Sequence, residues 1–244
     1  MLTGLWAPAS AQICSTPSFT LAPVYPVGVD IRSVAVADFD GDGKPDLAIA
    51  NADSSSVSVL EHVGLGEPAI NNTYTVGTFP LVVVTGDFTG DGKPDIVTAN
   101  DSSSNISLLR NNGSGGFVAA GTFNSGPGVS MVAGDFNNDD KLDVAVATGS
   151  SVGVLLGNGQ GSFGAPISFS GESSKIIAAD FNNDGKLDLA LSGSSIQIRL
   201  GDGTAHFPVA PCVVGSSGGL AAGDVNGDGK LDLVVANILA AQIQ

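Results

Sequence analysis

Apolar residues in this chain gather in short runs of four to eight positions or alternate with polar residues, and they form no long amphipathic stripe. Examples are S-V-A-V-A at 33–37, L-V-V-V-T at 81–85 and K-I-I-A-A at 175–179. Gly, Ser, Asn and Asp separate the runs, which is typical of short strands joined by tight turns. No run approaches the roughly 18 residues that a membrane helix needs. The pattern predicts an all-β protein without a membrane span.

A nine-residue acidic segment recurs five times between these runs. The copies are D-F-D-G-D-G-K-P-D (38–46), D-F-T-G-D-G-K-P-D (87–95), D-F-N-N-D-D-K-L-D (135–143), D-F-N-N-D-G-K-L-D (180–188) and D-V-N-G-D-G-K-L-D (224–232). Their starting positions differ by 49, 48, 45 and 44 residues. Five copies in nearly constant register indicate a repeat architecture.

Each acidic segment lies between two apolar runs that are expected to be strands. A Ser/Asn/Gly turn and a third alternating strand follow, for example at 57–60 and 106–109, and a Gly-rich hairpin then leads into a fourth strand. Four strands in about 45 residues are the strand count and period of a propeller blade. The phenylalanines at position 2 of the segments are expected to pack between blades. They are Phe39, Phe88, Phe136 and Phe181.

The formal net charge of −15 is concentrated in the five segments. They contain 17 of the 24 acidic residues and five of the nine basic residues, which gives them a net charge of −12. The overall acidity disfavours binding to nucleic acid. Because the charge is gathered at repeated places, the sequence predicts bound cations rather than only a solvated surface.

The donor types in the segments favour calcium. Oxygen atoms at positions 1, 3, 5 and 9, with the backbone carbonyl of position 7, offer five or more ligands, and Ca²⁺ accepts six to eight. No Cys or His occurs in any segment, which argues against zinc. The closing acid is at position 9 instead of position 12 and the flanks are strand-like, so the segment is not an EF-hand. Position 6 is glycine in four copies, which suits a turn with positive φ.

The repeated unit resembles the FG-GAP or VCBS-type repeat of integrin-alpha-like β-propellers over about residues 18–244. F-G-A-P at 163–166 nearly reproduces the motif that gives the family its name, and G-F-V-A-A (116–120) and H-F-P-V-A-P (206–211) are looser versions. The resemblance implies a single propeller domain over 12–244, with about five four-stranded blades. It also implies a structural calcium hairpin between the first two strands of each blade.

By this resemblance, about five Ca²⁺ ions would be held by side chains at positions 1, 3, 5 and 9 and by the position 7 carbonyl. The implied ligands are Asp38, Asp40, Asp42, Lys44 and Asp46; Asp87, Asp91, Lys93 and Asp95; Asp135, Asn137, Asp139, Lys141 and Asp143; Asp180, Asn182, Asp184, Lys186 and Asp188; Asp224, Asn226, Asp228, Lys230 and Asp232. Two departures predict weaker binding in the second and third loops. Thr89 replaces a carboxylate or amide at position 3, and Asp140 replaces the glycine at position 6.

The sequence leaves two alternatives for the ring. Residues 19–28 align with the fourth-strand segment 207–215, so an N-terminal strand would complete the last blade and close a five-bladed ring. In the other alternative the chain is a fragment of a larger propeller, because the family usually has seven blades and the last third strand stops about two residues early.

Residues 1–11 end in an A-x-A pattern, which indicates the remnant of a signal peptide; the alternative is a start-site remnant. We therefore expect a secreted or cell-surface protein. Cys14 and Cys212 would lie near each other if the terminal strand completes the last blade, and they would then either pair or remain free thiols.

No G-x-S-x-G or other nucleophile context occurs, and neither histidine has a cysteine partner. We therefore expect a non-enzymatic adhesion module that binds an extracellular protein or a glycan. The alternatives are an accessory propeller of a carbohydrate-active enzyme, similar to those of some polysaccharide lyases, and a scaffold fragment of a larger surface protein. The ligand itself is not readable from the sequence, because variable surface loops set the partners of propellers.

Overall fold

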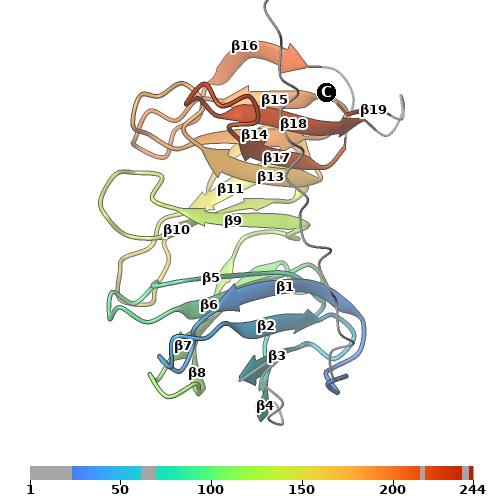
Figure 1. Ribbon diagram of the computed structural model, residues 1–244, viewed down its shortest axis with the longest axis vertical. Helices are drawn as coiled ribbons and strands as arrows, with labels where there is room; N and C mark the ends of the chain where they lie inside the picture. Colours follow the sequence, from blue (N-terminus) through green and yellow to red (C-terminus); the bar gives the residue numbers. More distant parts are fainter. Residues whose placement is uncertain (1–23, 62–69, 215–217, 238–241, 244) are drawn as a thin grey trace, which may run out of the picture.

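The computed structural model describes residues 24–61, 70–214, 218–237 and 242–243 (Figure 1). These residues form 19 strands in five antiparallel sheets. None of them is helical, so the described part of the chain contains no helix that could cross a membrane. The predicted all-β class is confirmed.

The strands follow one another in chain order within every sheet. The first sheet contains β1 (Ile31–Ala37), β2 (Asp46–Asn51), β3 (Ser56–Glu61) and β4 (Ile70–Thr75). The second contains β5 (Pro80–Gly86), β6 (Asp95–Asn100), β7 (Asn105–Asn111) and β8 (Phe117–Asn124). The third contains β9 (Ser130–Gly134), β10 (Asp143–Ala147), β11 (Gly149–Leu155) and β12 (Ile167–Ser173). The fourth contains β13 (Lys175–Ala179), β14 (Asp188–Ser192), β15 (Ile196–Arg199) and β16 (Val209–Val214). The fifth contains β17 (Leu220–Gly223), β18 (Asp232–Asn237) and β19 (Gln242–Ile243).

The sheets are the blades of a β-propeller. Their first strands, β1, β5, β9, β13 and β17, pack against one another in this order, as Figure 1 shows. Residues from all five of these strands, or next to them, line one shared cavity of about 350 Å³. The first strands are therefore the innermost strands around a common axis. The described residues provide four complete blades and a fifth sheet of three strands.

Three predictions about the chain ends lie outside the described residues. They are the leader at 1–11, most of the segment 19–28 that would complete the last blade, and the side chains of Cys14 and Cys212. The choice between a closed five-bladed ring and a fragment of a larger propeller therefore stays open.

Pairs of phenylalanines pack between neighbouring blades, from the first blade to the fourth. The position 2 phenylalanine of one acidic loop meets the phenylalanine at the hairpin before the fourth strand of the following blade, in tilted or edge-to-face contact. The pairs are Phe39–Phe117 at 5.2 Å, Phe88–Phe163 at 5.7 Å and Phe136–Phe207 at 5.8 Å between ring centroids. The predicted packing of these phenylalanines between blades is confirmed for the first three loops.

Burial at position 2 falls toward the last blade. Phe39, Phe88 and Phe136 are each 2% exposed, whereas Val225 in the fifth loop is 70% exposed. Val36 on the free side of the first blade is 60% exposed. Because each blade is covered by its neighbours, the described end blades each leave one apolar face open.

Arg199 is a buried cation at a position that the other blades fill with leucine. Strand pairing places it opposite Leu189, in the register that Leu60, Leu109 and Leu155 occupy in the first three blades. The Arg199 side chain is only 8% exposed, and burial lowers its pKa. Its guanidinium donates to the Ser170 carbonyl at 2.6 Å and lies 5.2 Å from the ring centre of Phe169.

The Arg199 guanidinium forms no ion pair with a described carboxylate, and its buried Nε donates to no described acceptor. Burying an incompletely paired charge costs free energy. The blade accommodates Arg199 through hydrogen bonds to the Ser170 carbonyl and to Gln197 Oε1 and through one aromatic contact, where the first three blades have a leucine.

We expect Arg199→Leu to raise the free energy of unfolding by about 1–3 kcal/mol, because it removes a buried charge and restores the repeat's apolar residue. Urea unfolding at fixed calcium concentration measures the change. Arg110 in β7, an exposed arginine of another blade, gives the control, since Arg110→Leu should alter stability by less than about 0.5 kcal/mol. A clear loss of stability in Arg199→Leu would contradict this reading of the buried guanidinium.

Candidate functional site

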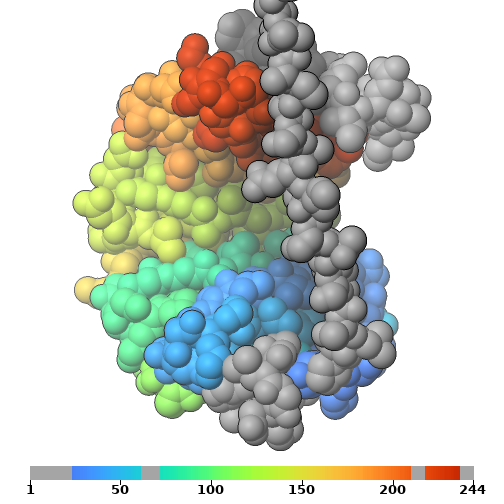
Figure 2. Space-filling model, in the orientation of Figure 1, coloured from blue at the N-terminus to red at the C-terminus, as the bar shows by residue number. Residues whose placement is uncertain are grey.

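The five acidic segments connect the first and second strands of the five blades, as predicted. The inner strands pack side by side in chain order, as the colours of the blades show in Figure 2, and the loops that follow these strands lie on one side of the propeller in Figure 1. Cavities of about 260 and 280 Å³ lie between the first and second loops and between the third and fourth loops. The fold therefore gathers the acidic charge along one rim.

The loops share one backbone conformation. Positions 4 and 6 have positive φ in every copy, with values between 58° and 82°. These residues are Gly41, Gly43, Gly90, Gly92, Asn138, Asp140, Asn183, Gly185, Gly227 and Gly229. The turn at position 6 was expected, and Asp140 adopts it without glycine. The requirement at position 4 was missed, although only Gly and Asn, which tolerate this region, occur there.

The position 1 carboxylate organises each loop. Asp38 accepts hydrogen bonds from the N–H groups of Gly41, Asp42 and Gly43 at 2.8, 3.1 and 2.8 Å. The first aspartate of every other loop likewise accepts the N–H groups of positions 5 and 6. These bonds curl the backbone of each loop around the carboxylate of position 1.

The first loop contains the densest group of acids. Asp38, Asp40 and Asp42 each place one carboxylate oxygen within 4.8 Å of the others. Ionised carboxylates at this range repel one another strongly. A hard divalent cation that prefers oxygen fits this donor set, whereas a soft metal does not. The other loops have two acids at these positions, with Thr89, Asn137, Asn182 or Asn226 at position 3.

The position 7 lysine compensates part of the charge at position 5. Lys44 Nζ lies 2.6 Å from Asp42 Oδ2, and this bond raises the pKa of Lys44. Lys141 lies 3.0 Å from Asp139 and lowers the pKa of that carboxyl. These ion pairs are largely exposed, so each contributes little to stability. One ammonium group per loop leaves the loop acidic.

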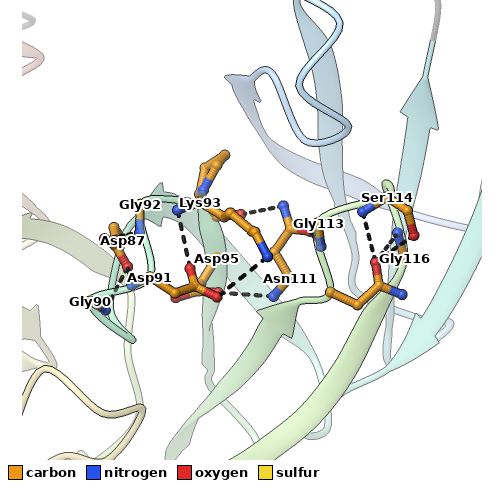
Figure 3. A network of polar contacts seen from close by, with 12 residues as sticks. Asp87, Gly90, Asp91, Gly92, Lys93, Asp95, Asn111, Gly113, Ser114 and Gly116 are labelled. Atoms are coloured by element: carbon orange, nitrogen blue, oxygen red, sulfur yellow. Dashed lines mark hydrogen bonds and ion pairs between the residues drawn. The ribbon is translucent and has the colours of Figure 1, made fainter.

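In the first four loops the position 9 aspartate is buried, and it anchors the loop to its blade. In Figure 3, Asp95 accepts the N–H of Asn111 at the end of β7, at 2.9 Å. Its other oxygen accepts the N–H of Phe88 at 3.0 Å. Asp143 makes the same two bonds with Gly157 and Phe136.

Burial at position 9 disfavours the charged form. It raises the pKa of Asp95 and Asp188, and it raises the pKa of Asp143 to about 6, although the N–H bonds act in the opposite direction. A bound cation would favour the ionised carboxylate. Each oxygen keeps a lone pair beside its N–H bond, so anchoring is compatible with coordination. The sequence predicted this residue only as a ligand and gave no signal of the anchor, because its partner at the end of the third strand lies 13 to 16 residues away.

Every residue that the sequence predicted as a ligand lies in a described loop. The structure brings the carboxylates of positions 1, 3 and 5 together in the first loop, and this group does not include Asp46 at position 9. In the third, fourth and fifth loops the N–H of position 5 donates to the side-chain oxygens of positions 1 and 3. The structure also shows that the position 7 lysine side chain can pair with the acid at position 5. The sequence had predicted only the backbone carbonyl of this lysine, as a ligand. Among the described residues, the first loop is the place where three carboxylates come together as a possible cation site.

The family of the chain follows from sequence comparison. The FG-GAP-like repeat matches residues 38–98, 87–146 and 135–191, and the FG-GAP repeat matches residues 218–237. Together these matches cover more than half of the chain and include all five acidic loops. No curated protein matches the sequence.

Solved structures with the same fold have low sequence identity. An Agrocybe aegerita lectin that recognises non-reducing terminal N-acetylglucosamine is 20% identical, with a TM-score of 0.55 over 82% of this chain and 59% of the lectin. A functionally unknown protein from Desulfotomaculum acetoxidans is 15% identical, with a TM-score of 0.55 over 79% of this chain and 63% of that one. The Vibrio cholerae biofilm matrix protein Bap1 is 16% identical, with a TM-score of 0.50 over 85% of this chain and 35% of Bap1.

The chain therefore spans less than two thirds of the length of each of these proteins. The likeness to them shows the fold, and the repeat matches show the family. With its five acidic hairpins on a propeller of four-stranded blades, the chain belongs to the FG-GAP repeat family.

Proposed function

We propose that the protein is a non-enzymatic, extracellular β-propeller whose acidic loops bind structural calcium and whose surface binds a protein or glycan in adhesion. The observation that carries the proposal is the grouping of Asp38, Asp40 and Asp42 within 4.8 Å. The backbone conformation of that loop recurs in the other four.

Calcium would be held by the side chains of positions 1, 3, 5 and 9 and the carbonyl of position 7 in each loop. Its contribution there is charge compensation. The five loops have a net charge of −12, so five Ca²⁺ ions would leave them at about −2. The ion would cross-link the turn to the buried anchor at position 9 and so hold the first two strands of a blade together.

Two further points support an extracellular binding role. Extracellular calcium is millimolar, which is enough to fill open sites of low affinity. Two proteins that share the fold are a lectin that recognises N-acetylglucosamine and a protein of the biofilm matrix. A propeller offers both a rim and an axial face to a partner.

Glycan-array and pull-down screens, each run with calcium and with EDTA, test the binding function. A partner that is retained with calcium and lost with EDTA supports it. Equal capture of a partner in calcium and in EDTA would contradict a binding surface that depends on bound calcium.

Removing calcium should lower the melting temperature sharply. A cation that binds only the folded chain contributes RT ln(1 + [Ca²⁺]/Kd) per site, which is about 1–3 kcal/mol at ten to a hundred times Kd. Differential scanning calorimetry in calcium and in EDTA measures the difference. Calcium added in excess over EDTA should restore the original melting temperature. An unchanged melting temperature in EDTA would contradict a structural role for calcium.

Thr89→Asp should tighten calcium binding in the second loop by about tenfold, because it supplies the third carboxylate that the first loop has at this position. Thr89→Asn is the matched variant, since it adds an amide oxygen without charge, as in the last three loops, and should have an intermediate effect. Isothermal titration of the three proteins compares the affinities. Equal affinities would show that position 3 does not contact the ion.

Asparagine substitutions at positions 5 and 9 should separate the calcium-ligand role of an aspartate from its role as a hydrogen-bonded anchor. In EDTA, Asp95→Asn should cost about 1–3 kcal/mol, because its amide group cannot accept both buried N–H bonds. Asp91→Asn, at an exposed position, should cost less than about 0.5 kcal/mol in EDTA. In calcium, both variants should gain less stability from the ion than the unsubstituted protein does. Urea unfolding in the two buffers gives all four values, and equal costs in EDTA would contradict the anchor.

A further inference from the structure

The propeller axis contains a cavity at the end of the inner strands opposite the acidic loops. It has a volume of about 350 Å³ and is lined by residues from every blade. One ring of its lining comes from equivalent positions, five residues before the first aspartate of each loop. The ring consists of Ser33, Val82, Ser130, Lys175 and Gly219. Since a strand rises about 3.3 Å per residue, the ring lies roughly 16 Å from those aspartates.

The walls of the cavity combine apolar side chains with two fixed hydroxyls. Leu81, Met131 and Ile177 are among the apolar residues. Ser33 Oγ accepts the N–H of Val83 at 3.2 Å, and Ser130 Oγ accepts the N–H of Ile176 at 3.2 Å. Each bond crosses to the next blade, so it fixes the serine while leaving its O–H group as a donor.

The charge of the lining is opposite to that of the protein. Lys175 and Arg32 both line the cavity, and no described aspartate or glutamate does. The chain as a whole carries −15, with only nine basic residues. The Lys175 ammonium forms no ion pair with a described carboxylate.

Arg32 is held in place from outside the cavity. Its Nε and Nη2 donate to Asp30 Oδ2 at 2.9 and 2.7 Å, and its guanidinium lies 5.6 Å from the ring centre of Phe79. Its other terminal nitrogen makes no hydrogen bond to a described residue. Asp30 offsets the charge of Arg32, so Lys175 supplies the net positive charge of the cavity.

We propose that this axial cavity binds a small organic carboxylate with an apolar body. The carboxylate would pair with Lys175 and accept hydrogen bonds from Arg32, Ser33 and Ser130, while the apolar body would contact the strand-lined walls. A cavity of this volume takes a ligand of about one aromatic ring. The inference deepens the proposed binding function by naming a ligand class, and it rests on that function but not on calcium.

Fluorine NMR with para-fluorobenzoate tests the site, and uncharged para-fluorobenzamide is the matched probe. We expect the acid to bind at least about tenfold more tightly than the amide. Lys175→Met should weaken binding of the acid about tenfold, whereas Lys175→Arg, which keeps the charge, should stay within about threefold. Arg110→Met removes a cation that does not line this cavity and should change nothing. The melting temperature of each variant confirms that it is folded.

Three results would overturn the proposal: no binding of the acid, equal binding of acid and amide, or full affinity in folded Lys175→Met. Running the titration in calcium separates it from the proposed calcium role. Calcium-insensitive melting with intact, Lys175-dependent probe binding would reject the calcium role alone. Calcium-dependent melting without probe binding would reject the axial site alone.

Discussion

The buried carboxylate at the end of the first four acidic loops is the interaction on which the blade architecture depends. In the second, third and fourth blades it accepts one N–H from position 2 of its own loop and another from the end of the third strand. One side chain thereby joins the loop, the second strand that it begins and the third strand. A negative charge at this depth needs the N–H donors around it and favours a cation above it. The position 9 acid is therefore part of the blade structure itself, in addition to its predicted role as a ligand.

Packing between blades depends on the phenylalanine at position 2 of the anchored loop. The loop directs its position 2 phenylalanine toward the next blade, where it meets the hairpin phenylalanine of that blade. Each blade is stabilised mainly by its neighbours, as in other repeat proteins. The same logic explains why position 2 is exposed in the fifth loop, where no described blade follows.

The two ends of the inner strands have different chemistry. One end leads into the acidic loops, which require a fixed backbone with two positive φ angles and therefore vary little among the five copies. The other end meets at the axis, where equivalent positions carry Ser, Val, Ser, Lys and Gly. The positive φ angles constrain only the residues at the loop end of each inner strand. The residues at the axial end are outside this constraint and differ from blade to blade. The proposed calcium rim and the proposed axial site can thus coexist on one small fold.

The sequence by itself determined the blade, its order of strands and the placement of the acidic loops, because these depend on patterns within about 45 residues. Asp38, Asp40 and Asp42 were predictable as a group for the same reason. The anchor role of Asp95, the buried Arg199 in a leucine position and the cavity around Lys175 were decided only by the tertiary structure. Each of them depends on residues from another strand or another blade, and the register of those neighbours is set by packing rather than by local pattern.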